Sequence, residues 1–227
     1  MMIDYEAGVK YANRKINAGI NFYYMDYYDQ LVLNGKINDV GSYTRVNIDR
    51  SYRMGAELEA AWMPVNKLTL KGNLTISDNR IKEFIEYTDA YDVDFNYLGQ
   101  ETDTFNNTTI AFSPSLTSAV QLSYTPLSST EISLIARHVS EQFLDNTENS
   151  ERIIPAYTVT DLRISFTPAT KWCRKLRVDL LVNNLFSTMY SSNGYTYGYL
   201  YDNSRYQEDF FYPQATINYL AQVTLRL

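Results

Sequence analysis

The sequence contains no long apolar run, and none of its segments approaches the roughly 18 apolar residues that a membrane-spanning helix needs. It has one cysteine, Cys173, which excludes a disulfide within the chain. Cations are not in excess, because 20 Lys and Arg stand against 26 Asp and Glu, for a formal net charge of -6. Such a chain has no cationic surplus to displace counterions from phosphates, so nucleic acid is not an expected partner.

Catalytic and cofactor-binding patterns are equally scarce. His138 is the only histidine, and no cysteine lies near it in the sequence. Phosphate-binding loops and zinc-ligand spacings are missing. We therefore expect no enzyme activity, no cofactor and no metal centre, and we interpret His138 as an ordinary position on a strand.

Tyrosine is abundant instead, with 21 residues. Its apolar ring and polar tip suit a boundary between apolar and wet phases, and it favours strands. A spanning β-barrel contacts lipid with only every second residue, so its mean hydropathy looks like that of a soluble protein. The missing apolar helix therefore does not exclude a membrane.

Apolar and polar residues alternate along much of the chain, as they do in half-buried strands. From residue 52 to residue 62, one face is apolar and aromatic, whereas the other carries Arg53, Glu57 and Glu59. We predict nine such strands, near residues 5–11, 16–24, 52–62, 68–77, 116–125, 131–143, 156–167, 176–183 and 218–227.

The connections between these strands alternate in length. The short ones are residues 13–14, 64–67, 126–130 and 168–175, and the long ones are residues 33–50, 80–107, 145–154 and 187–212. An antiparallel up-and-down meander with this rule has every long loop at one end, which is typical of transmembrane barrels. The fold class is therefore predicted to be an all-β, up-and-down transmembrane β-barrel segment.

A soluble β-sandwich is the alternative fold. Its strands usually run for about 5–6 residues and its loops lie at both ends. Several segments here alternate for ten or more residues, which fits the roughly 9–11 residues that cross a bilayer at a tilt. Charged side chains such as Lys71, Arg177 and Asp179 on the opposite faces fit a wet lumen.

Four stretches resemble one known family, the TonB-dependent receptors. Residues 4–10 (DYEAGVK) resemble its E-x-G-x-K strand, and residues 51–59 (SYRMGAELE) resemble its x-x-G-x-E-x-E strand. Residues 182–186 (VNNLF) resemble the penultimate strand. Residues 212–215 (YPQA) resemble the lead-in to the last strand, although the usual Arg is absent. The region around residues 145–147 is similar to receptors from Bacteroidetes.

This resemblance implies a 22-stranded barrel in the outer membrane of a Gram-negative bacterium, with a plug domain inside. Residues 1–227 would form the last nine strands, and the plug and earlier strands would be absent. Because no secretory signal precedes Ile3, we expect a piece of a longer polypeptide. The chain alone should then transport nothing, and its two unpaired edges would not be tolerated in lipid.

The resemblance also implies the partners and the activity. The plug would contact the TonB energy-coupling complex. The barrel-assembly machinery would recognise the final strand, which ends at Leu227, a position where outer-membrane barrels most commonly have Phe. The expected activity is uptake of a scarce small-molecule ligand such as a ferric siderophore or another iron complex. A passive porin or structural barrel, and a soluble β-rich binding domain, remain the alternatives.

Two long loops contain candidate binding residues. In the 187–212 loop, a strand is predicted to continue with one aromatic face, made of Tyr195, Tyr197, Tyr199 and Tyr201. These rings could stack on a siderophore, haem, corrinoid or glycan. Those rings could instead belong to an interfacial girdle or pack the loop on itself. In the 80–107 loop, three carboxylates could bind Ca²⁺ or simply be solvated: Asp89, Asp92 and Asp94. A smaller polar cluster could likewise bind an ion or simply be solvated: Asp145, Asn146, Glu148 and Asn149.

Overall fold

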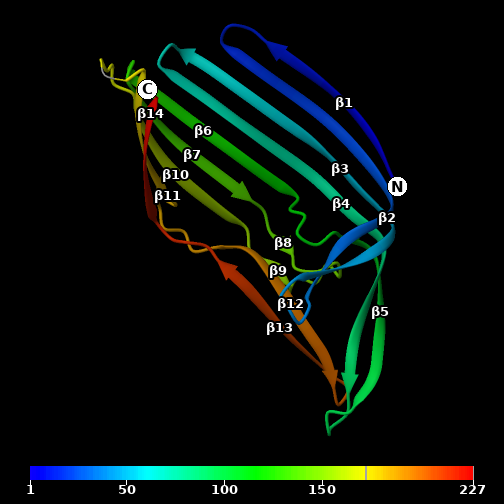
Figure 1. The fold of residues 1–227 in the computed structure, drawn as a ribbon. Coiled ribbons are helices and arrows are strands. Elements are labelled where there is room, and N and C mark those ends of the chain that lie inside the picture. The colour runs from blue at the N-terminus through cyan, green and yellow to red at the C-terminus, as the bar shows by residue number, and fades with distance from the viewer. Residues whose placement is uncertain (172, 227) are drawn as a thin grey trace.

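The computed structural model describes residues 1–171 and 173–226, and the regular elements in this part of the chain are all β-strands (Figure 1). No helix there is long and apolar enough to cross a membrane. Leu227, which the sequence predicts as the end of the last strand, and residue 172 in the predicted 168–175 turn lie outside the described residues. The strands are β1 (Met2–Ala12), β2 (Ile16–Ile37), β3 (Tyr43–Val65), β4 (Leu68–Tyr91), β5 (Tyr97–Thr109), β6 (Leu116–Leu127), β7 (Thr130–Val139), β8 (Gln142–Phe143), β9 (Ile153–Ile154), β10 (Tyr157–Phe166), β11 (Lys175–Asn183), β12 (Ser191–Tyr201), β13 (Ser204–Pro213) and β14 (Asn218–Arg226).

Nine of these strands form one continuous antiparallel wall. Their order is β1-β2-β3-β4-β6-β7-β10-β11-β14, so each wall strand pairs with the next wall strand along the chain. These nine coincide with the nine segments that the alternation predicts. The up-and-down fold is therefore confirmed, and β1 and β14 are the two edges of the wall (Figure 1).

The register of the wall separates an apolar face from a polar one. Residues directly opposite each other in a ladder share a face. One unbroken row of cross-strand partners is apolar on seven neighbouring strands: Trp62, Leu70, Leu122, Leu134, Leu162, Val182 and Tyr219. The next row, on the opposite face, is polar on five strands and is interrupted by Ala61 and Ile135: Lys71, Gln121, Asp161, Asn183 and Asn218. A large exposed apolar sheet of this kind needs a lipid solvent.

Aromatic residues border the apolar face at both ends. Tyr24 stacks on Tyr52 with ring centroids 6.0 Å apart, and Tyr5 lies 6.5 Å from Tyr24, which makes a row across β1, β2 and β3. Trp62 and Tyr124 lie near the short turns on the same face. Tyr52 and Trp62 are separated by about 23 Å along the membrane normal, taking ~3.3 Å per residue and a ~45° tilt. This separation fits the apolar band of an outer-membrane barrel, which is about 25 Å tall.

The long connections are tall hairpins rather than irregular loops, which corrects the expectation for residues 33–50 and 80–107 and confirms the strand predicted through residues 195–201. β2 and β3 remain paired up to Ile37 and Tyr43, and β4 continues beyond the wall to pair with β5. β12 and β13 form a third hairpin, and β8 and β9 a small fourth one. Pairing within each hairpin satisfies the backbone groups that a long loop would leave to water. All of them project from the end opposite the short turns (Figure 1).

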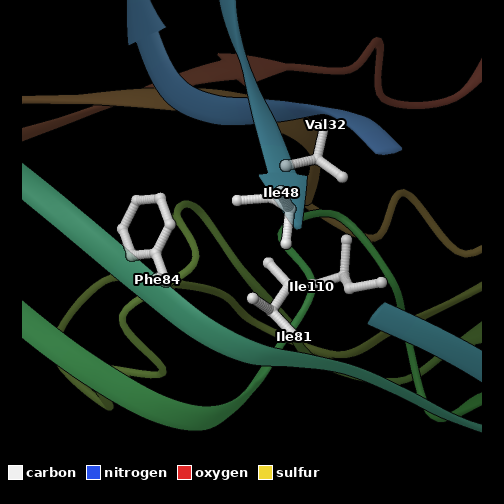
Figure 2. Close-up of a cluster of buried hydrophobic side chains, with 5 residues drawn as sticks. All are labelled: Val32, Ile48, Ile81, Phe84 and Ile110. Atoms are coloured by element: carbon white, nitrogen blue, oxygen red, sulfur yellow. The ribbon is translucent and has the colours of Figure 1, made fainter. Parts of the chain in front are cut away.

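The hydrophobic core lies where these hairpins meet, not in the wall. The wall is a single layer, whereas five side chains at the hairpin bases are at most 5% exposed and pack together (Figure 2): Val32, Ile48, Ile81, Phe84 and Ile110. They come from β2, β3, β4 and the segment after β5. We call the β2–β3, β4–β5 and β12–β13 hairpin ends together with residues 140–156 the cap. The cap is thus a folded unit on top of the wall.

Candidate functional site: the cap and the lumen face

The four predicted tyrosines lie on one strand, β12, at alternate positions, as the sequence suggests. β12 pairs with β13 and, through Leu200 and Tyr201, runs parallel to the end of β4. This pairing joins two hairpins that are far apart in the sequence. The tip of the β12–β13 hairpin therefore lies beside the tip of the β4–β5 hairpin (Figure 1).

Two of the tyrosines hold these hairpin tips together. Tyr201 stacks on Phe95 with centroids 4.4 Å apart and donates a hydrogen bond from its hydroxyl to the carbonyl of Val93, at 2.9 Å. Tyr199 meets the edge of Tyr91 at 6.1 Å. For these two residues, the structure supports the interpretation in which rings pack the cap on itself.

The other two tyrosines make their ring contacts within the β12–β13 hairpin. Tyr195 stacks on Phe210 at 4.8 Å, and this pair offers a continuous aromatic surface. Tyr197 is 54% exposed. Partial burial raises the pKa of the Tyr197 phenol, and the nearby Tyr91 adds to the effect. Tyr197 is therefore open to a ligand, and Tyr195 presents the part of its ring that Phe210 and Tyr212 leave uncovered.

The predicted acidic residues are spread along one hairpin. Asp89 accepts a hydrogen bond from the Gln100 amide at 2.8 Å. Asp92 shapes the β4–β5 turn, since it accepts from the backbone of Asp94 and Asn96 and from the Asn96 side chain, and these bonds lower the pKa of Asp92. Within residues 1–171 and 173–226, no group of three His, Cys, Asp or Glu side chains is placed to hold a metal ion. Ion binding here stays a prediction.

Sequence reasoning missed a buried ion network beneath the aromatic tip. Arg152 contacts Asp145 at 2.6 Å and Glu86 at 2.9 Å, and these three side chains are 5%, 4% and 8% exposed. The other oxygen of Glu86 contacts Arg205 at 3.0 Å, and Arg205 also contacts Asp103 at 2.6 Å. Burial alone would lower the pKa of Arg152, but Asp145 and Glu86 outweigh burial and raise it. The network therefore joins β4, β5, β13 and the 140–156 segment.

The polar cluster at residues 145–149 fastens the cap. The Asn146 amide donates to the carbonyl of Leu33 and accepts from the backbone of Ala111, both at 2.8 Å. Glu148 contacts Arg80 at 2.8 Å. Buried polar groups of this kind are costly unless paired, and here they are paired across three elements. The one sequence signal for this role was a set of amide and carboxylate residues with an arginine in the same loop.

Tyr43 makes one further link in the cap. Its hydroxyl donates to the carbonyl of Gly194 at 2.9 Å, and its ring meets the edge of Phe112 at 5.9 Å. Burial, together with the neighbouring Tyr212, raises the pKa of Tyr43 to about 12. The β12–β13 hairpin is thus tied to β3 as well as to β4.

The lumen face of the wall is polar, as predicted, and two glycines of the family-like motifs lie on it. A Cβ added to Gly55 would stand 2.6 Å from the Tyr23 hydroxyl and would also clash with the carbonyl of Ile76, and one added to Gly8 would stand 2.8 Å from the carbonyl of Ile20. Glycine at these positions lets neighbouring side chains lie flat on the wall. His138 lies on β7, and its Nδ1 is 2.9 Å from the hydroxyl of Thr158, a wall contact rather than a catalytic one.

The comparisons with known proteins agree with this geometry. A family model for the β-barrel of TonB-dependent receptor-like proteins matches residues 3–185. No curated protein sequence matches the chain.

Solved structures share the fold at low sequence identity. The ferric citrate transporter FecA is 16% identical over 98% of this chain and 30% of its own, with a TM-score of 0.68. The siderophore receptor PiuA from Acinetobacter baumannii is 15% identical over 97% of this chain and 28% of its own, with a TM-score of 0.62. The copper transporter OprC is 16% identical over 98% and 30%, with a TM-score of 0.65. The chain thus spans less than a third of these proteins.

Proposed function

The chain belongs to the TonB-dependent receptor family, whose members are transporters in the Gram-negative outer membrane and not enzymes, and on this premise we propose that it forms the last nine strands of a 22-stranded barrel. The nine-strand wall with open edges at β1 and β14 supports this proposal. The plug and the earlier strands would belong to the rest of the polypeptide. The barrel-assembly machinery would recognise β14.

The proposed activity of the whole receptor is energy-coupled uptake of a scarce ligand, a ferric siderophore or another iron complex. The plug would contact the TonB complex. The observation that carries the ligand class is the available aromatic surface of Tyr195, Phe210 and Tyr197 on a rigid cap, because flat rings stack on planar chelating groups and phenols donate hydrogen bonds. A Bacteroidetes origin remains part of the proposal and rests on residues 145–147.

The test uses the full-length receptor in cells with and without a functional TonB complex. We expect uptake of ⁵⁵Fe-labelled siderophores that requires TonB. The double substitution Tyr195→Ala with Tyr197→Ala should weaken binding about tenfold, since each lost ring contact is worth roughly 0.5–1.5 kcal/mol. Tyr11→Ala, at the turn end of the wall, is the matched control and should change nothing.

Other outcomes would point elsewhere. Uptake that continues without TonB would favour a passive porin. Uptake of copper but of no iron complex would move the proposal to another cargo. Unchanged siderophore binding in the double variant would remove these tyrosines from the ligand site.

A further inference from the structure

Cationic side chains form a row down the lumen face of β7, β10, β11 and β14. They line a groove of about 810 Å³ on this face: Arg137, Arg163, Arg177, Lys175 and Arg226. Only three carboxylates accompany them: Glu131, Asp161 and Asp179. A cationic surplus gathered in one place is unexpected in a chain whose net charge is -6.

The strand register orders these cations from the cap to the short turns. Arg137 lies opposite Val159 near the cap, Arg163 lies opposite Leu181 at mid-height, and Arg177 lies opposite Thr224 lower down. Successive lumen positions along one strand are about 6.6 Å apart. Arg163 lies level with Ser133, two such positions below Arg137, and Arg177 lies two positions below Arg163, so a ligand moving along the wall would meet a new arginine about every 13 Å.

In two of the three ion pairs the carboxylate lies against the wall while the guanidinium group stands out into the lumen, whereas Glu131 and Arg163 are exposed to a similar degree, 42% and 35%. Asp161 is 9% exposed, whereas its partner Arg137 is 55% exposed. Asp179 is 16% exposed, and its partner Arg177 is 36% exposed. A guanidinium group has five N–H donors, and a bond to one carboxylate leaves several of them free. The row thus offers donors and positive charge to the lumen even where it is paired.

The turn end of the row holds two neighbouring cations, Lys175 and Arg226, that have no carboxylate side chain of the described residues between them. Lys175 lies directly opposite Arg226 in the β11–β14 ladder, and both face the lumen. Like charges in this position are destabilising. Among residues 1–171 and 173–226, no carboxylate side chain forms a salt bridge with either of them. An anion at this place would relieve the repulsion.

We propose that this cationic row is a transit path for an anionic ligand, a molecule that carries carboxylate or phosphate groups. The inference rests on the proposed uptake function and specifies the charge of the cargo. Guanidinium groups bind carboxylates and phosphates through paired hydrogen bonds. Several weak sites in sequence let a ligand enter, step and leave, whereas one strong site would trap it.

The lumen face of β1 to β4 provides an internal comparison. It carries both signs, with Glu6, Glu57 and Glu59 beside Lys10. Lys71 lies on the same face of β4, away from the row. A lumen position in this region should therefore show no preference for anions.

The first experiment measures the charge preference of the row in the full-length receptor, in a Cys173→Ser background. Leu220→Cys places a thiol in the groove, and Asn73→Cys places one on the mixed face. Each cysteine variant is treated separately with two thiol reagents, the anionic sulfonatoethyl methanethiosulfonate and the cationic trimethylammonioethyl methanethiosulfonate, and the two labelling rates are measured. The anionic-to-cationic rate ratio should be about tenfold higher at position 220 than at position 73, because surface potentials reach several kT. Adding Arg163→Gln and Arg177→Gln should abolish this difference, whereas Lys71→Gln should not.

Equal ratios at the two positions would overturn the inference. So would exclusion of the anionic reagent from position 220, the result expected if an acidic face of the plug occupies the row instead. Labelling requires neither TonB nor uptake, so it can succeed even if the proposed transport function fails.

A second readout follows transport. If the receptor imports iron chelates, Arg163→Gln with Arg177→Gln should lower uptake of anionic ferric citrate at least fivefold and leave uptake of a neutral ferric hydroxamate unchanged. An equal loss for both chelates would contradict a path that selects for charge.

Discussion

Arg152 shows how a single side chain can determine the shape of the cap. It is buried between Asp145 and Glu86, and Glu86 in turn holds Arg205. A buried ion pair adds little stability over apolar packing, but removing one partner leaves an uncompensated buried charge. The network therefore fixes where the hairpins sit more than it adds to overall stability.

Replacing Arg152 should open the cap locally. Arg152→Gln leaves the Asp145 carboxylate buried without a cation and leaves Glu86 with Arg205 alone, at a cost of about 3–5 kcal/mol. We expect faster cleavage of the cap hairpins when a protease is added to intact cells that display the full-length receptor. Arg45→Gln, at an exposed position on β3, is the matched control. Identical cleavage rates for the two variants would contradict a structural role for the network.

Tyr43 should respond to alkaline pH. Its pKa in the folded protein is about 12, above the ordinary value of 10.0. The stability that comes from keeping this phenol neutral is present below pH 10 and is lost as the pH rises towards 12. The difference in ultraviolet titration between the full-length receptor and its Tyr43→Phe variant should show one phenol ionising near pH 12. A phenol that ionises near pH 10 would show that Tyr43 is not held between β3 and β12.

At the scale of the strand, period-two alternation was enough to predict the nine wall elements. It fails above the membrane for a physical reason. Ile81 and Phe84 on β4 are three positions apart and are both buried, because the hairpins there meet neighbours on both faces. Once both faces of a strand are covered, alternation no longer distinguishes strand from loop. This is why alternation does not reveal the upper parts of the β2–β3 and β4–β5 hairpins, whereas the alternate tyrosines of β12 do predict a strand.

The candidate site was predictable only in part. The shared face of Tyr195 and Tyr197 follows from their spacing on β12. The neighbours of the site do not, since Tyr199 meets Tyr91 and Arg152 meets Glu86 across long separations in the sequence. Such contacts are set by how the hairpins fold back on each other, and no local pattern records them.

Gly55 should be intolerant of a side chain. An alanine there would push into the Tyr23 ring and the carbonyl of Ile76, and overpacking of this kind costs about 1–3 kcal/mol. Gly55→Ala should lower the temperature at which the full-length barrel loses its compact form on a denaturing gel. Gly72→Ala is the comparison, because its added Cβ comes no closer than 3.2 Å to a neighbouring atom. Equal midpoints for the two variants would mean that Tyr23 moves aside freely.

For the molecule as a whole, the wall is one layer thick and open at β1 and β14. Neither feature suits an isolated protein in water. A single sheet with one apolar face needs lipid, and lipid does not tolerate open strand edges. Lipid would cover the apolar face, and in the proposed receptor further strands would pair with β1 and β14. The cap contains the only cluster of buried apolar side chains in the described part of the chain.

The two faces of the wall can be tested with neighbouring residues on β6. Val120 lies on the apolar face near the middle of the strand, and Gln121 lies on the lumen face. An arginine on the lipid face near the bilayer midplane costs about 2–4 kcal/mol, whereas the lumen accepts it. We therefore expect Val120→Arg to reduce the amount of full-length receptor assembled in the outer membrane, and Gln121→Arg to leave it unchanged. Normal assembly with Val120→Arg and failure with Gln121→Arg would contradict the assignment of this chain as a barrel wall with its lumen on the polar side.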